Sequence, residues 1–286
     1  MAGSINERIL SAEEKWLDLV RPYCANLFSE TFIPSHDHKH HQRVWEICKL
    51  LLIELDGFNA VAGQDLVEGL MLAAWFHDTG MVKDSGIRHG ALGREEFETF
   101  IRNTVSVEPG QYSQISEAIE FHDTKGPSAY PKLKTGTAPG ILGILSVADD
   151  LDALGIIGIY RYVEIYLERK VPIGELGIKI LDNVRRRFDH IMESCADLPG
   201  IVDPHRTSFQ NIEDFFKCYN QQLMLEKEAE KVSWGQLGIV NLIRRFSLDL
   251  EIRPEKFKDQ PEVVSGGDLV KNYFYGLHRE LELKNK

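Results

Sequence analysis

The sequence predicts an all-α protein, and two observations support this fold class. Apolar residues recur every three to four positions along nearly the whole chain of 286 residues, which is the period of an amphipathic helix. No segment shows the strict apolar–polar alternation that is typical of a half-buried strand, and we find no internal repeat or low-complexity tract. We therefore expect a helical bundle.

The N-terminal part of the chain is predicted to contain five helices. The first opens at the capping box Ser11-Ala-Glu-Glu14, the second follows a break at Pro34, and the third is almost wholly apolar until it stops at Gly80. The predicted spans are 11–30, from after Pro34 to 57, 64–79, 94–102 and 112–121.

A loop rich in glycine and proline is expected over residues 125–140, and long loops inside compact domains are often functional. Beyond it we predict helices at 141–153, 157–168, 173–195, 212–228, 234–248 and 268–283, with a polar connector over 252–267. We place a metal-binding helical domain at residues 1–160 and a helical extension packed on it at 161–286. No clear linker separates the two, so they could also form one domain.

Composition excludes several classes of partner. The chain has 33 Lys and Arg against 44 Asp and Glu, a formal charge of −11, which argues against a bulk nucleic-acid partner and against anionic membranes. The most apolar run, 141–159, contains three aspartates and is not expected to span a bilayer. Four scattered cysteines and no secretory signal pattern at the N-terminus predict a cytoplasmic protein. The sequence leaves the oligomeric state open, including a homo-oligomer.

Histidine is unevenly distributed, because seven of the ten histidines fall between residues 36 and 122. Three stretches combine imidazole and carboxylate groups, which together suit a divalent metal that stays partly open to water. They are 36–44 (HDHKHHQRV), 75–80 (WFHDTG) and 148–155 (ADDLDALG). Asp78 ends an apolar helix, where an ionised carboxylate costs several kcal/mol unless a cation compensates it.

These stretches resemble the HD-domain (His-Asp) metal-dependent phosphohydrolase superfamily. Its pattern is a His, a His-Asp doublet and a distant Asp, and this chain resembles it at His40, His77-Asp78 and Asp149 over roughly residues 34–160. The resemblance implies an all-α HD-domain bundle with these four residues as metal ligands. Some members add two histidines that build a two-metal site, and His89 and His122 occupy comparable places.

The resemblance implies a phosphohydrolase that cleaves a phosphate ester or anhydride of a nucleotide or small phosphorylated metabolite by attack of metal-bound hydroxide. One or two divalent ions are expected, with Mn, Fe, Co, Ni, Mg and Zn not distinguished. With two ions, Asp78 would bridge them. Arg43, on the same helical face as His40, is a candidate to hold the phosphate or to form an ion pair with a carboxylate such as Asp37 or Asp78.

Other residues receive lesser roles. Lys125 is a further candidate for substrate binding, and so is Asp152, one turn after Asp149, with helix packing as its alternative role. Lys83, Arg88 and Arg94 are weaker candidates for phosphate contact. His36 and Asp37 are expected to orient the ligands or touch substrate, whereas His41 is expected to be exposed because it points about 100° away from His40 on a helix.

Two alternatives to the hydrolase remain. A subset of the superfamily carries the ligand set His, His-Asp, His, His, Asp with two irons and oxidises its substrate with O₂, and His89 and His122 make this set available here. The chain could instead be a non-catalytic helical module that binds a metal or a nucleotide.

Overall fold

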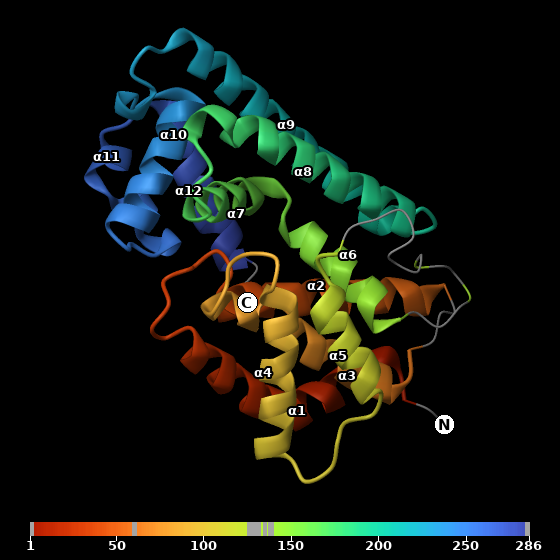
Figure 1. Ribbon diagram of the computed structural model, residues 1–286. Helices are drawn as coiled ribbons and strands as arrows, with labels where there is room; N and C mark the ends of the chain where they lie inside the picture. Colours follow the sequence, from red (N-terminus) through yellow and green to blue (C-terminus); the bar gives the residue numbers. More distant parts are fainter. Residues whose placement is uncertain (1–2, 59–61, 125–132, 134–135, 137–139, 284–286) are drawn as a thin grey trace. The chain divides into compact units, whose positions relative to one another are not determined.

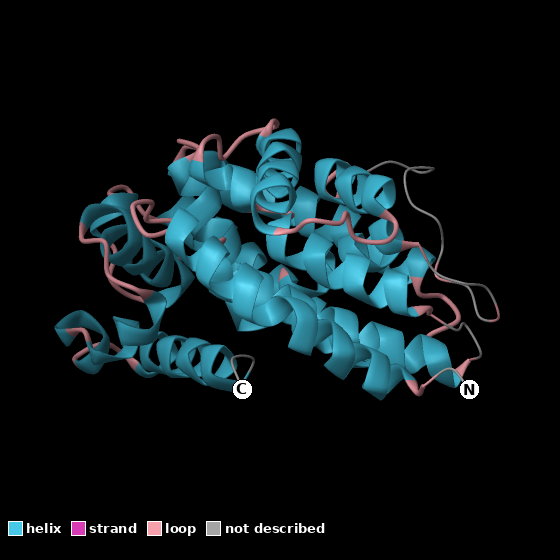
Figure 2. Ribbon diagram, turned by 90° about the horizontal axis from the view of Figure 1, so that it is seen from below, coloured by secondary structure: helices cyan, strands magenta, loops and turns pink. Residues whose placement is uncertain are grey.

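The computed structural model describes residues 3–58, 62–124, 133, 136 and 140–283. Within these residues every regular element is a helix and none is a strand, so the predicted all-α fold is confirmed (Figure 2). None of their helices is both long enough and apolar enough to cross a membrane.

The chain divides into two compact units, and each is discontinuous in sequence. Unit 1 comprises Met1–Leu151 and His190–Asp203, and unit 2 comprises Asp152–Asp189 and Pro204–Lys286. Two helices, α8 (Ile173–Ser194) and α9 (Pro199–Leu225), each contribute residues to both units. The expected division was a single one, between residues 160 and 161.

Unit 1 is built around α3 (Gln64–Phe76; Figure 1). Residues 66–76 of this helix are all buried. An almost continuous apolar sequence has no polar face to give to solvent, so such a helix is covered on all sides. Its neighbours in unit 1 are α1 (Ile5–Leu27), α2 (His38–Gly57), α4 (His89–Thr104) and α5 (Tyr112–Phe121). A short 3₁₀ helix, η1 (Thr79–Val82), and α6 (Ile141–Asp152) belong to the same unit, except for Asp152 at the end of α6.

The first helix begins earlier than the sequence analysis predicted. Its N-cap is Ser4, which forms a capping box with Glu7, and Ser11 lies inside the helix. Both serines match the capping pattern locally, but only the earlier start buries Ile5 and Ile9 against the unit. Burial of apolar side chains therefore decided between two equivalent caps.

Two other helices also begin earlier than expected. Helix α4 starts at His89 rather than near Arg94, and α9 starts at Pro199 rather than near residue 212. Pro204 argued against a helix that starts before it, since a proline inside a helix removes one backbone hydrogen bond. The burial of Ile201 and Val202 in that first part offsets this loss.

Unit 2 contains most of α8 and α9 together with the C-terminal helices. Phe188 and Phe209 stack at 4.1 Å between the two long helices. The aromatic core of the C-terminal part includes Phe246, Phe257 and Phe274. The helices are α7 (Gly155–Glu168), η2 (Ala229–Lys231), α10 (Gly235–Arg244), η4 (Pro254–Asp259), α11 (Pro261–Val264) and α12 (Asp268–Leu283).

Two predictions for this region need correction. The helix expected to run to residue 248 changes at Arg245–Asp249 into a π-helical turn. The expected irregular connector 252–267 contains η4 and α11, because prolines at the first positions of both helices have no amide hydrogen to lose there.

Candidate metal centre

Six buried side chains of unit 1 form two overlapping groups of potential metal ligands. The first group is His40, His77, Asp78 and Asp149, and the second is Asp78, His89 and His122. All six residues were predicted as ligands from the sequence, and the structure brings them together. His40 lies on α2, His77 and Asp78 directly follow α3, His89 begins α4, His122 directly follows α5, and Asp149 lies on α6.

Three of the imidazoles are oriented by the same local contact. His77 and His122 directly follow α3 and α5, and His89 begins α4. The Nδ1 atoms of these histidines lie 2.9, 2.8 and 2.6 Å from the carbonyl oxygens of Ala74, Ile119 and Gly86, each three residues earlier in the chain.

This contact fixes which ring nitrogen carries hydrogen. A carbonyl oxygen only accepts, so Nδ1–H must donate in all three rings. In the neutral ring Nε2 then has the free lone pair, and it is Nε2 of each that approaches Asp78. Metal-binding histidines are usually oriented in this way by the hydrogen bond of their second nitrogen.

Glycines allow α4 to bring His89 to the other ligands. A side-chain carbon at Gly90 would overlap the carbonyl oxygen of Glu120 at the end of α5. At Gly93 it would lie 2.9 Å from the carbonyl oxygen of Phe76 and 3.0 Å from that of His77. The sequence His89-Gly-Ala-Leu-Gly93 therefore lets one helix contact the ends of two others, and this spacing was a signal that the sequence analysis did not use.

The first group is compact. Nε2 of His40 lies 3.1 Å from Nε2 of His77, 3.3 Å from Oδ2 of Asp78 and 3.5 Å from Oδ1 of Asp149. Nε2 of His77 lies 3.4 Å from the same Oδ2 of Asp78. Two imidazoles and two carboxylates thus direct their donor atoms at one point.

The second group uses the other oxygen of Asp78. Nε2 of His122 lies 3.2 Å and Nε2 of His89 lies 3.5 Å from Oδ1 of Asp78. One carboxylate therefore presents Oδ2 to one pair of histidines and Oδ1 to another pair. This division is the geometry of a carboxylate that bridges two cations.

The spacing of the donor atoms fits divalent metal binding. Two atoms bonded to one ion at about 2.1 Å are about 3.0 Å apart at a right angle and about 3.4 Å apart at the tetrahedral angle. The separations around His40, His77 and Asp78 are 3.1 to 3.4 Å. Mixed nitrogen and oxygen donors suit Mn, Fe, Co, Ni or Zn ions, so the donor set does not select one of them.

The charges of the cluster favour a bound cation. Burial alone would raise the pKa of Asp78, but the charge of His77 and hydrogen bonds from His122, His40 and His77 hold that pKa well below its usual value. Burial would lower the pKa of His77, but the charges of Asp78 and Asp149 outweigh it, so this pKa is raised. Without a metal, a proton on His77 supplies positive charge, and a bound metal ion would displace it.

Of the three main candidates for substrate binding, Arg43, Asp152 and Lys125, two lie among the described residues. Arg43 is buried on α2, one turn after His40. Asp152 is fully buried and accepts a hydrogen bond from Arg161 at 3.1 Å within unit 2. Neither residue belongs to the two ligand groups. Lys125 lies outside the described residues.

The three weaker candidates for phosphate contact are paired with carboxylates. Lys83 forms an ion pair with Glu96 at 3.1 Å, and Arg88 with Asp84 at 2.9 Å. Arg94 bonds two glutamates, at 2.8 and 2.7 Å.

One histidine next to His40, His41, is buried where the sequence predicted exposure. His41 was predicted to be exposed, but it is fully buried, and its ring centroid lies 5.4 Å from that of Phe28 and 5.1 Å from that of His77. The prediction was wrong because α2 is covered on this side as well. Burial, together with the nearby His77 and His40, lowers the pKa of His41 well below its usual value, so the ring is neutral.

His36 and Asp37 lie just before these residues. The His36 ring lies 5.6 Å from that of His40, and Asp37 caps α2 by accepting a hydrogen bond from the amide of Lys39 at 2.9 Å. Asp37 therefore helps to fix where the helix that carries His40 begins.

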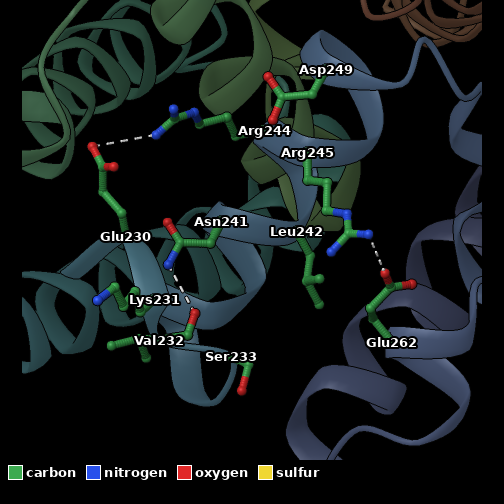
Figure 3. Close-up of a pocket in the computed structure, with 10 residues that line it drawn as sticks. All are labelled: Glu230, Lys231, Val232, Ser233, Asn241, Leu242, Arg244, Arg245, Asp249 and Glu262. Atoms are coloured by element: carbon green, nitrogen blue, oxygen red, sulfur yellow. Dashed lines mark hydrogen bonds and ion pairs between the residues drawn. The ribbon is translucent and has the colours of Figure 1, made fainter. Parts of the chain in front are cut away.

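Unit 2 has a separate pocket of about 310 Å³, formed largely by η2, α10 and the π-helical turn (Figure 3). Arg245 forms an ion pair with Glu262 at 2.9 Å, and Arg244 approaches Glu230 at 3.5 Å. Three cationic and three acidic side chains line it, so their formal charges cancel, and no imidazole or thiol is among the lining residues. The pocket therefore lacks the donor set of the metal centre.

Comparison of the sequence with known protein families and curated proteins, and of the fold with solved structures, found no match.

Proposed function

We propose that this protein is a metal-dependent phosphohydrolase that acts on a nucleotide or another small phosphorylated metabolite. The observation that carries the proposal is the pair of ligand groups that share Asp78. Structural metal sites are usually closed by four ligands, whereas catalytic sites keep positions open for water and substrate. The second group offers only three protein ligands, which leaves room for both.

The two ligand groups would each bind one metal ion. The first group offers four ligands and the second three, so we expect two ions, with the first bound more tightly. A divalent ion bound here would lower the pKa of a coordinated water and neutralise charge on a phosphate oxygen. Asp78 would hold both ions, and the Nδ1 contacts of three histidines keep the rings in place before substrate arrives.

Arg43 is the residue that we propose for holding the phosphate. Its position one turn after His40 keeps it near the first ligand group, and a guanidinium pairs with two phosphate oxygens at once. Lys125 keeps its proposed role in substrate binding. The proposal makes no use of Asp152, whose carboxylate already bonds Arg161.

The direct test measures phosphate release from a panel of nucleotides and phosphate monoesters. The protein is first treated with a chelator, and Mn²⁺, Mg²⁺, Co²⁺ or Ni²⁺ is then added. We expect release that depends on the added metal and that is lost in Asp78→Asn. Arg43→Met should lower the rate at least 100-fold and leave the metal content unchanged. A protein loaded with metal that releases no phosphate from any compound would exclude the proposal.

A second function is favoured by the same six residues. The ligand order His40, His77-Asp78, His89, His122, Asp149 resembles that of the HD-type enzymes that oxidise a substrate with two irons and O₂. Iron bound in a ratio of two per chain, with O₂ consumption on addition of a substrate, would favour this function. Full hydrolytic activity of an iron-free protein would exclude it.

We also propose a cytoplasmic location and a small-molecule substrate. All four cysteines are free thiols, three of them buried, which suits a reducing compartment. The net charge of −11 disfavours nucleic acid as a bulk partner.

A further inference from the structure

Helix α6 carries two consecutive buried aspartates that have different partners. Asp149 belongs to the first ligand group, whereas Asp150 accepts a hydrogen bond from Nδ1 of His190 at 2.6 Å. Successive residues on an α-helix point about 100° apart. The two contacts therefore hold α6 on two different faces, and together they resist rotation of the helix about its axis.

The contact between Asp150 and His190 is short, and its carboxylate is fully buried, whereas the His190 side chain keeps 14% of its surface exposed. Asp150 has no exposed surface, and a buried carboxylate costs several kcal/mol unless it is hydrogen-bonded or paired. The ring of His190 supplies a donor from α8, and a hydrogen bond to a carboxylate is about twice as strong as one between neutral groups. A carboxylate oxygen only accepts, so Nδ1–H of His190 is the donor in this contact.

A third contact fixes the same helix one turn earlier. The hydroxyl of Ser146 donates to the backbone carbonyl oxygen of His122 at 3.1 Å. Helix α6 is thus attached to the second ligand group through Ser146, to the first through Asp149, and to α8 through Asp150. Of these three attachments, only the contact with Asp150 involves a residue, His190, that lies far in the sequence from both ligand groups.

We propose that His190 is a positioning residue for Asp149. By holding Asp150, it keeps the neighbouring carboxylate directed at His40, from which Oδ1 of Asp149 is 3.5 Å away. This inference rests on the proposed metal centre. It assigns a role to a histidine that lies far from the three metal-binding stretches in the sequence.

The role predicts a specific loss of metal affinity. Removing a partner that orients a metal ligand typically costs 10- to 100-fold in affinity. We expect this loss for His190→Leu at the tighter of the two ions, because Asp149 belongs only to the four-ligand group. His190→Asn should recover most of the affinity, since its amide nitrogen occupies the place of Nδ1. If His190→Leu does not fold, His190→Gln takes its place in the experiment. Its amide lies one bond further from the backbone, so we expect it to lose the contact with Asp150 and to show the same loss of affinity.

The experiment titrates the full chain with Co²⁺ after chelation and records heat and the visible spectrum, which reports the ligand geometry. The free energy of unfolding is measured in parallel without metal. Ile191→Ala is the control, because this neighbour on α8 is fully buried and its apolar side chain makes no such polar contact. It should lower stability and leave Co²⁺ affinity and spectrum unchanged.

Two results would overturn the role of His190. One is Co²⁺ affinity in His190→Leu within twofold of the parent protein. The other is an equal loss of affinity in Ile191→Ala or in His190→Asn, which would show a general effect of stability. A parent protein that binds Co²⁺ but releases no phosphate would contradict the proposed hydrolase alone, because this experiment measures binding and not turnover.

Discussion

The shared carboxylate of Asp78 makes a sharp prediction about metal stoichiometry. Asp78→Asn removes the one ligand that both groups use, leaving three donors in the first group and two in the second. His122→Ala leaves all four donors of the first group and removes one from the second. Asp78→Asn should therefore weaken both ions, and His122→Ala only one.

The magnitude follows from binding linkage. At a free metal concentration of about 100 times Kd, one bound ion adds about 2.7 kcal/mol to the free energy of unfolding. Two ions that each reach this ratio add about 5 kcal/mol, of which Asp78→Asn should lose most, whereas His122→Ala should lose only the part contributed by the ion of the second group. Chemical denaturation with and without Mn²⁺ measures these differences, and elemental analysis counts the ions.

A second His-Asp doublet in the chain provides the control. His122-Asp123 has the same two residue types in the same order as His77-Asp78, but Asp123 is exposed whereas Asp78 is buried. Asp123→Asn should therefore leave both ions in place. Tight binding of an ion at the first group in Asp78→Asn, or equal losses in Asp78→Asn and His122→Ala, would refute the bridging arrangement.

Three further predictions concern packing and charge. The pKa of His41 is lowered, so the folded protein does not take up the proton that the unfolded chain accepts below about pH 6.5, and the parent loses stability as the pH falls. In metal-free protein, the free energy of unfolding of His41→Leu should therefore gain about 2 kcal/mol relative to the parent between pH 6.5 and pH 5, as measured by chemical denaturation. The Glu68 carboxylate bonds Lys15 at 2.6 Å, and although burial alone would raise its pKa, its hydrogen bonds lower it. Glu68→Gln should thus cost about 1.5–3 kcal/mol at pH 7, a difference that disappears as the pH falls below the usual value of 4.5 through the lowered pKa. Gly90→Ala should displace α4 from the end of α5 and weaken the ion of the second group more than that of the first, as measured by metal titration.

Each of these three predictions has an outcome that contradicts it. A constant difference between His41→Leu and the parent across this pH range would mean that the His41 ring takes up a proton in the folded protein. A Glu68→Gln effect that persists at pH 3 would point to packing instead of charge. Equal weakening of both ions in Gly90→Ala would show that α4 does not serve the second group specifically.

Much of the candidate site could be predicted from the sequence, because the relevant information is local. An apolar helix that ends in His77-Asp78 already demands compensation for a buried charge, whatever the rest of the fold. The resemblance to the HD-domain pattern added His40, His89 and His122 as candidate ligands. Helix periodicity likewise gave the all-α class and the ends of α5 and α12, since it needs only neighbouring residues.

The tertiary structure decided what local patterns left open. The sequence does not distinguish Asp123 from Asp78, yet one is exposed and the other is buried between four histidines. His41 was expected on an exposed face, but packing covers it. The reason is that burial depends on which helices pack against a residue, and those helices are far away in the chain.

The same reason explains the contacts that carry the new inference. His190 meets Asp150 across 40 residues of chain, and no local pattern relates the two. Which oxygen of Asp78 faces which pair of histidines also depends on how α2, α4 and α5 converge around α3. The sequence by itself determined which side chains could bind a metal, and the packing of the helices determined how their donor atoms are grouped and which residues hold them in place.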